Sequence, residues 1–179
     1  SGAAVAVGAM TPHAAVADSA EIRAKITALA ALAGGLGDPA VRHRGTIGGS
    51  ISNNDPAADY PAGLVALDAT VVTDRRSLGA EQFFRGVFET ALEPGEIVRA
   101  VRFKVPAEAA YVKFPNPASR YAVAGVFVAR FPSGVRVAVT GAGPGVFRVP
   151  EMEAALSKRF TPAAIEGIKI AADGLNADL

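Results

Sequence analysis

The sequence predicts an α+β fold in which a mixed sheet with helices is followed by an antiparallel sheet with helices. Three observations lead to this prediction. Apolar residues recur at helical spacing between residues 22 and 33, three strand-like runs follow one another between residues 109 and 140, and a helical pattern returns after residue 150. Strands and helices that are grouped rather than strictly alternating are typical of α+β domains.

The chain begins with a strand-like run, Val5 to Met10, which Thr11-Pro12 ends. A helix is expected next, because Ser19 suits the N-cap and the apolar positions that follow share one face: Ile22, Ile26, Leu29 and Ala33. Gly34 and Gly35 stop this helix. Residues 34–61 are rich in Gly, Asn, Asp and Pro and are expected to form a loop, too long to be a simple linker.

Short elements are expected between residues 62 and 106. We predict a helical turn at 62–67, a strand at 69–73, a small helix at 82–84 and, after a turn at 92–95, a strand at 96–105. Pro106 closes that strand. A boundary there divides the chain into a first domain of residues 1–106 and a second domain of residues 107–179.

Strand patterns dominate the start of the second part. Strands are expected at 109–114, 122–131 and 135–140, and the tripeptide Pro132-Ser133-Gly134 joins the last two as a hairpin. The glycine-rich residues 141–145 then turn the chain into a helix at 150–159. A further helix is expected over 163–172, with Thr161-Pro162 at its start.

Composition argues against several classes of function. With 18 basic and 17 acidic residues, mostly scattered, the chain has no electrostatic preference for nucleic acid or anionic lipid. It has no cysteine, hence no disulfide or iron–sulfur cluster of its own, and its two histidines, His13 and His43, make no metal site without carboxylates. No apolar run reaches the roughly 18–20 residues of a membrane helix, and no signal peptide is visible, so we expect a cytoplasmic protein.

The segment from Val41 to Pro61 carries the chemistry. Its glycines allow close backbone approach to a ligand, and successive backbone N–H groups of such a loop can converge on phosphate oxygens. Asp55 and Asp59 can accept hydrogen bonds from ribose, adenine or ring N–H groups. A loop of this composition is, however, more often a plain turn, and it matches neither G-x-G-x-x-G nor the P-loop. Composition and spacing alone therefore indicate an anion or nucleotide loop and no more.

The order of residues is more specific. The run Val41-Arg42-His43-Arg44-Gly45-Thr46-Ile47-Gly48-Gly49, followed by Asp55-Pro56-Ala57-Ala58-Asp59, resembles the second flavin-binding segment of the flavoprotein subunits of molybdenum hydroxylases, the family of carbon monoxide and xanthine dehydrogenases. The resemblance continues through residues 92–98, 111–114, 119–123 and 141–150, and so covers nearly the whole chain. It implies FAD as cofactor. It also implies partners, a molybdenum-bearing large subunit and a small [2Fe-2S] subunit, from which electrons pass through the flavin to an external acceptor.

The resemblance also implies roles for individual residues. Thr46, Gly48 and Gly49, with Ile47 between them, correspond to contacts with the diphosphate and ribityl region, and Asn53 and Asp55 lie where the loop meets the cofactor. Asp59 corresponds to an acceptor toward the flavin or its adenosine. Val98 and Lys113 correspond to contacts with the isoalloxazine edge, Tyr121 to an aromatic near its face, and Leu36 to an apolar contact.

Each of these residues also has a plainer interpretation. Lys113 is otherwise an exposed charge on an edge strand, Tyr121 a core or hairpin aromatic, and Asp59 the cap of the helical turn that follows. No nucleophile, general base or carboxylate pair stands in a persuasive setting, so no catalytic residue is predicted. This suits a subunit whose cofactor supplies the chemistry.

One family feature has no counterpart here, a glycine-rich A-G-G-x-S-like loop upstream of the strand at Val5. The family also usually continues beyond the point where this sequence stops. We therefore expect a chain truncated at both ends that folds but binds free FAD weakly and is inactive in isolation. Two other functions stay open: another FAD-dependent reductase of the same fold, and a flavin-free assembly module on the same scaffold.

Overall fold

The structure, a computed structural model, describes residues 4–170 and 174–175. Within these residues the strands form two four-stranded antiparallel sheets and one short hairpin. The first sheet has the order β1 (Ala4–Gly8), β6 (Val98–Lys104), β2 (Thr70–Thr73) and β3 (Ser77–Gly79). The second has the order β10 (Phe147–Arg148), β9 (Gly134–Thr140), β8 (Ala122–Phe131) and β7 (Glu108–Pro115). The hairpin pairs β4 (Phe84–Gly86) with β5 (Glu89–Thr90).

Most helices belong to the first part of the chain and are short. They are α1 (His13–Asp18), α2 (Ala20–Lys25), α3 (Thr27–Gly34), α4 (Pro39–Arg44), α5 (Ile47–Asn53), α6 (Tyr60–Ala66) and α7 (Ala80–Phe83). After the second sheet come α8 (Pro150–Lys158) and a 3-10 turn, η1 (Pro162–Ile165).

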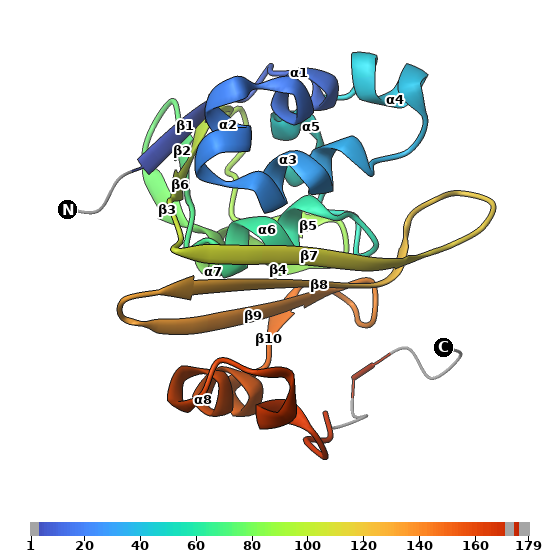
Figure 1. The fold of residues 1–179 in the computed structure, drawn as a ribbon. Coiled ribbons are helices and arrows are strands. Elements are labelled where there is room, and N and C mark those ends of the chain that lie inside the picture. The colour runs from blue at the N-terminus through green and yellow to red at the C-terminus, as the bar shows by residue number, and fades with distance from the viewer. Residues whose placement is uncertain (1–3, 171–173, 176–179) are drawn as a thin grey trace.

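Helix α6 lies between the two parts of the molecule (Figure 1). It packs against α3 on one side and against β8 and β9 on the other. Helix α8 covers the opposite face of the second sheet, where it contacts β9. The second sheet is therefore buried between two helical layers, except along its edge strand β7.

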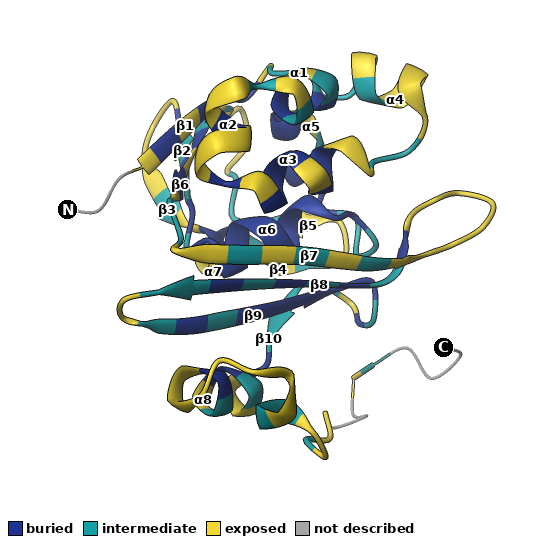
Figure 2. Ribbon diagram, viewed as in Figure 1, coloured by how far each residue is buried: buried dark blue, intermediate teal, exposed yellow. Residues whose placement is uncertain are grey.

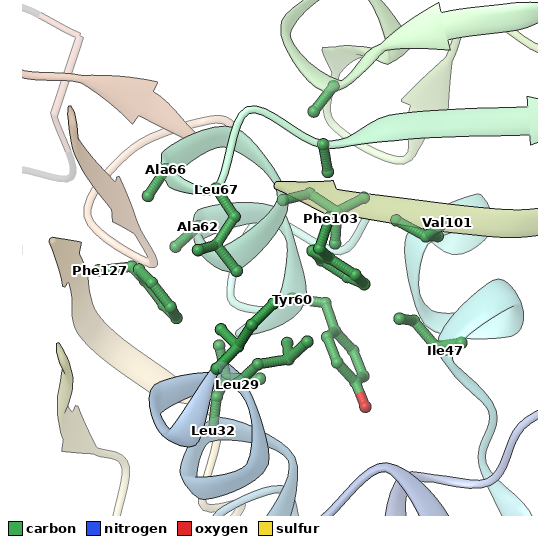
Figure 3. Close-up of a cluster of buried hydrophobic side chains, with 14 of the residues drawn as sticks. Leu29, Leu32, Ile47, Tyr60, Ala62, Ala66, Leu67, Val101, Phe103 and Phe127 are labelled. Atoms are coloured by element: carbon green, nitrogen blue, oxygen red, sulfur yellow. The ribbon is translucent and has the colours of Figure 1, made fainter. Parts of the chain in front are cut away.

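Every residue of α6 is buried, as its uniform dark colour in Figure 2 shows. The main hydrophobic cluster surrounds this helix and takes side chains from both sheets; those close to it include Leu29, Ile47, Tyr60, Phe103 and Phe127 (Figure 3). A second, smaller cluster joins α8 to the outer face of β9. Because Phe127 of β8 and Phe103 of β6 share one core, the two sheets are fixed relative to each other.

The structure confirms the α+β class and most of the expected strands, and it differs from the sequence interpretation in four places. The first sheet, expected to be mixed, is antiparallel in every pairing of the described residues. The helix expected from Ser19 to Ala33 is broken at Ile26, whose backbone (φ −143°, ψ 65°) is not helical. The expected Ser19 cap is present, with its hydroxyl accepting the N–H of Ile22 at 3.3 Å.

The third difference is that residues 34–61 are not a continuous loop. Asp38 caps α4 by accepting the N–H of Val41 at 2.8 Å, with Pro39 at the first helical position. The fourth lies near the end of the chain: of the helix expected at 163–172, only the turn η1 forms, residues 166–170 are not helical, and residues 171 and 172 lie outside the described part. No helix of the described residues is long and apolar enough to cross a membrane.

Candidate cofactor cavity

The start of α5 is joined to the segment that leaves β1. Pro12 and Thr46 form an isolated antiparallel bridge, in which the N–H of His13 donates to the carbonyl of Gly45 at 3.0 Å. The N–H of Ile47 donates to Thr11 at 3.1 Å. Two distant segments, residues 9–13 and 45–48, therefore form one rigid unit.

This arrangement corrects one expectation. The turn from Gly45 to Gly49 was expected to present bare amide groups to a phosphate. Instead the N–H of Gly45 donates to Val41, that of Gly48 to Ala9 at 2.8 Å, and that of Gly49 to the Thr46 hydroxyl at 3.1 Å. Since these amides and that of Ile47 are already paired within the protein, the turn can offer a ligand mainly side chains and close backbone contact.

A cavity of about 340 Å³ opens above this unit, a volume within the range of roughly 300–1,000 Å³ that is typical of small-molecule sites. Its lining comes from four stretches of the chain: α1, the α3–α4 connection with α4, the segment from Gly45 to Asp59, and the β7–β8 loop. The lining residues are His13, Leu36, Gly37, Val41, Gly45, Thr46, Gly49, Ser50, Asn53, Asp55, Ala58, Asp59, Ser119, Arg120 and Tyr121. We call this space the cofactor cavity.

The structure brings most of the residues singled out in the sequence to this cavity. Those that line it are Leu36, Thr46, Gly49, Asn53, Asp55, Asp59 and Tyr121. Ile47 and Gly48 lie beneath it in the protein interior. Val98 lies at the start of β6, packs against the main core and is not among the lining residues, because its strand belongs to the first sheet.

Lys113 lies behind the cavity wall. Its ammonium donates to the carboxylate of Asp59 at 3.1 Å and to the carbonyls of Gly35 at 3.0 Å and Arg120 at 3.1 Å. An ammonium group has three N–H donors. All three are therefore matched by protein oxygens, and the side chain is only 11% exposed. Lys113 therefore supports the cavity wall. It is not an exposed charge on an edge strand, and it has no N–H group left to donate to a ligand.

Asp59 is the buried acid of this wall. The hydroxyl of Tyr111 donates to one carboxylate oxygen and Lys113 to the other. Burial raises the pKa of Asp59, while the Tyr111 hydrogen bond and the Lys113 charge oppose that rise. Burial, with the charge and hydrogen bond of Asp59, also raises the pKa of Tyr111, so this phenol stays protonated. The hydrogen bonds among Asp59, Tyr111 and Lys113, with those of Lys113 to Gly35 and Arg120, therefore connect α3, the start of α6, β7 and the β7–β8 loop.

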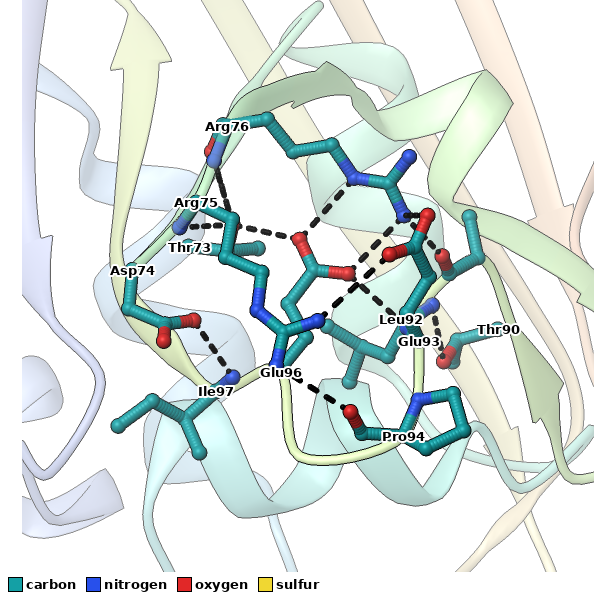
Figure 4. A network of polar contacts seen from close by, with 11 residues as sticks. Thr73, Asp74, Arg75, Arg76, Thr90, Leu92, Glu93, Pro94, Glu96 and Ile97 are labelled. Atoms are coloured by element: carbon teal, nitrogen blue, oxygen red, sulfur yellow. Dashed lines mark hydrogen bonds and ion pairs between the residues drawn. The ribbon is translucent and has the colours of Figure 1, made fainter.

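A second polar network lies around Glu96 (Figure 4) and explains another part of the sequence motif at residues 92–98. The Glu96 carboxylate, with no exposed side-chain surface, accepts two hydrogen bonds from Arg76, at 3.0 and 2.9 Å, one from the Thr73 hydroxyl at 2.7 Å and one from the N–H of Glu93 at 2.9 Å. These bonds lower its pKa from 4.5 to about 2, with the Arg76 contribution the largest. This network fixes the turn before β6 and lines no part of the cofactor cavity.

The lining also contains residues that sequence reasoning did not assign as ligand contacts, among them His13, Ser50 and Arg120. Ser50 directly follows the motif, and its hydroxyl is one of the short polar groups of the segment from Val41 to Pro61; its position one helical turn after Thr46 could have identified it as a contact. His13 follows the end of the first strand, far from the motif, and only the Pro12–Thr46 bridge reveals its place. Among the described residues, no group of three or more His, Cys, Asp or Glu is arranged to hold a metal ion.

Comparison with known proteins identifies the family. Residues 1–107 match the model of the FAD binding domain in molybdopterin dehydrogenase. This match covers more than half of the chain, and the chain therefore belongs to that family. Family membership confirms the resemblance seen in the sequence, and with it FAD as the cofactor of the domain.

Individual relatives agree with this assignment. The chain is 35% identical to the carbon monoxide dehydrogenase medium chain of Hydrogenophaga pseudoflava, over 96% of this chain and 64% of that one. It is 34% identical to the glyceraldehyde dehydrogenase medium chain of Sulfolobus acidocaldarius, over 83% of this chain and 57% of that one. A solved structure of the Hydrogenophaga pseudoflava carbon monoxide dehydrogenase superimposes with a TM-score of 0.83, covering 92% of this chain and 62% of that one. The chain thus spans somewhat less than two thirds of the length of these relatives.

Proposed function

We propose that the cofactor cavity holds part of FAD and that the chain serves as the flavin-binding, electron-transferring component of a molybdenum hydroxylase-type oxidoreductase. One observation carries this proposal. A cavity of suitable volume gathers Thr46, Gly49, Asn53, Asp55, Asp59 and Tyr121 from separate segments of a chain that belongs to an FAD-binding family. Bound FAD accepts electrons and passes them on, and the protein supplies position and electrostatic environment.

The polar groups of the cavity suit a flavin nucleotide. The side chains of Ser50 and Asn53 make no hydrogen bond to any other described residue, so they can donate to or accept from a ligand. The Thr46 hydroxyl accepts the N–H of Gly49 and keeps its own hydrogen for donation. Asp55 uses one carboxylate oxygen to accept the N–H of Ala57, which leaves the other for ribose or ring N–H groups. These residues provide both donors and acceptors, as a molecule with phosphate, sugar and ring polar groups requires.

The remaining predicted site residues have supporting roles in this proposal. Ile47 and Gly48 hold α5 against the segment after β1, and Lys113 fixes Asp59 and the loop that carries Tyr121. Val98 remains a predicted flavin contact for which the cavity lining gives no support.

The wider context is also part of the proposal. We expect a molybdenum-bearing large subunit and a small [2Fe-2S] subunit as partners, an external electron acceptor, and a cytoplasmic location. These follow from the family resemblance and the sequence. The division into domains at 1–106 and 107–179 is likewise a prediction; the two parts share the core around α6.

A second candidate function is a flavin-free assembly module. Val112 and Phe114, on the outward face of the edge strand β7, are 72% and 70% exposed, and exposed apolar side chains on a sheet edge are common where other proteins dock. FAD binding separates the two functions, because an assembly module has no need of the cavity.

The test is equilibrium dialysis of the purified protein, with any subunits that co-purify, against FAD. Saturable binding is expected, weak for the isolated chain and tighter where partner subunits co-purify. Ser50→Ala should weaken it by about five- to tenfold, the loss of one hydrogen bond. Ser52→Ala, on the same helix but outside the lining, is the matched control and should leave the affinity unchanged. Absence of FAD binding, or equal losses in both variants, would refute the assignment of this cavity.

A further inference from the structure

His13 is a buried residue for which neither the family motif nor the proposed function provides a role. It is the first residue of α1, and the residue is only 6% exposed. Its ring packs against Tyr60, with ring centroids 5.3 Å apart and planes tilted by 48°. Tyr60 belongs to the main core (Figure 3), so the imidazole packs against that core.

The polar atoms of this ring are not satisfied by the protein. Within residues 4–170 and 174–175, the Nδ1 atom of His13 is buried without a hydrogen-bond partner. The same holds for the hydroxyl of Tyr60 beside it. Leaving a buried polar atom unpaired costs about 1–3 kcal/mol, and native proteins rarely retain such a cost without a reason. A histidine used only as packing material could be replaced by an apolar residue at no such cost.

The other ring nitrogen lies at the cavity wall. A β-carbon built on Gly45 would lie 2.6 Å from Nε2 of His13, so the tip of the imidazole occupies the space that a side chain at position 45 would need. Gly45 and His13 both line the cofactor cavity. No described residue accepts from or donates to Nε2, which leaves this atom to whatever the cavity contains.

The ring is also in a suitable charge state. Burial lowers the pKa of His13, which therefore stays neutral at physiological pH. A neutral imidazole has one N–H donor and one bare nitrogen acceptor. It can form a hydrogen bond with a carbonyl, hydroxyl or ring nitrogen without the desolvation cost of a buried charge.

We propose that His13 is a cofactor-contacting residue, whose Nε2 forms a hydrogen bond with a polar atom of the bound flavin nucleotide. This inference rests on the proposed function, because it assumes that the ligand of the cavity is FAD. It adds a side chain from outside the sequence motif to the site. It also gives a reason for glycine at position 45, where any side chain would displace the imidazole.

The chain provides a built-in control for a direct test, since His13 and His43 are its only histidines. His43 is exposed on α4, has its Nδ1 2.7 Å from the carbonyl of Pro39, and does not line the cavity. With ¹⁵N-labelled histidine, addition of FAD should shift the ring nitrogen resonances of His13 and leave those of His43 in place. The measurement uses the unmodified protein, so it does not depend on a variant that folds.

Two substitutions then separate a hydrogen bond from packing. The Gln amide reaches about as far as Nε2, so His13→Gln should keep FAD affinity within about threefold, whereas His13→Leu should weaken it about tenfold. His43→Gln should have no effect. If FAD binds, the His13 resonances stay in place, and His13→Leu binds like the wild type, the inference is wrong and the proposed function stands. If the wild-type protein binds no FAD at all, both fail.

Discussion

Gly48 lies so close to Ala9 that no side chain fits between them. A β-carbon at position 48 would lie 2.6 Å from the Ala9 β-carbon and 2.7 Å from its carbonyl oxygen. That carbonyl also accepts the N–H of Gly48 at 2.8 Å. The first glycine of the Thr-Ile-Gly-Gly motif, Gly48, is therefore required for close packing of α5 on the segment after β1, beneath the cavity.

Gly48→Ala should destabilise the protein. The atoms it would meet belong to backbone and to a β-carbon, neither of which can rotate away, so a cost of about 1–3 kcal/mol is expected. Gly34→Ala is the control, because a β-carbon there would make only an ordinary contact, 3.8 Å from the Ala17 β-carbon. Urea denaturation followed by circular dichroism should show a clear loss of stability for the first variant and a change within about 1 kcal/mol for the second. Equal stabilities would mean that α5 shifts freely.

Lys113→Met should be among the more damaging single substitutions in the cavity wall. It leaves the buried carboxylate of Asp59 without its cationic partner, and breaking a buried pair in this way typically costs about 3–5 kcal/mol. Lys104→Met, at an exposed pair with Asp68, serves as the control and should cost at most about 1 kcal/mol.

The cost of Lys113→Met should depend on pH in a defined direction. Without Lys113 the pKa of Asp59, already raised by burial, rises further above that of the unfolded chain. The folded state then binds more protons than the unfolded state, so its stability falls as pH rises. Denaturation at pH 7 and at pH 5 should therefore show the larger penalty at pH 7. A penalty that grows toward acid would contradict this account of Asp59.

The sequence could predict those features of the structure that depend on residues close together in the chain. Alternation of exposed and inward-facing residues along β7, and the Ser19 cap, depend on neighbouring residues, and both were predictable. The Asp38-Pro39 start of α4 and the Thr46 cap of α5 were also visible as local signals, but the glycine-rich composition of residues 34–61 outweighed them in the interpretation.

Other features are long-range and could not be read from the sequence. The amides of Ile47 and Gly48 are used by carbonyls of Thr11 and Ala9, which come from the segment after β1. The same pairing places His13 at the cavity. The ordered motif identified the right segment for the site, whereas the role of its amide groups depended on a contact that no local pattern encodes.

Protonation of Glu96 should destabilise the protein in acid, and substitution of this residue should separate its contribution from that of other acidic groups. Its pKa is lowered from 4.5 to about 2 in the folded protein, so its stabilising contribution is fully present above pH 4.5 and is lost as pH falls toward 2. Glu96→Gln should lower stability at pH 7 and flatten its dependence on pH between those values. Glu93→Gln, at an exposed side chain of the same turn, is the control. If both variants keep the wild-type pH profile, the Arg76–Glu96 contacts contribute nothing to folding.

The last prediction concerns Asn54, which connects the cavity to the β4–β5 hairpin. Its side-chain amide donates to the backbone carbonyls of Gly86 at 2.9 Å and Glu89 at 2.7 Å. The backbone carbonyl of Asn54 accepts the N–H of Phe88 at 3.1 Å. Its backbone is left-handed, with φ 46°. Its neighbours in the chain, Asn53 and Asp55, both line the cavity.

Asn54→Ala should therefore cost about 2–4 kcal/mol, from two lost hydrogen bonds and from a left-handed backbone that alanine tolerates poorly. Asn54→Gly removes the same side-chain bonds but accepts that backbone, so it should be more stable than Asn54→Ala by about 1 kcal/mol. Both variants should weaken FAD binding, because the hairpin no longer fixes the segment that carries Asn53 and Asp55. Wild-type FAD affinity in both would show that these two residues hold their positions without the hairpin, and equal stabilities of the two variants would show that the backbone of Asn54 is unstrained.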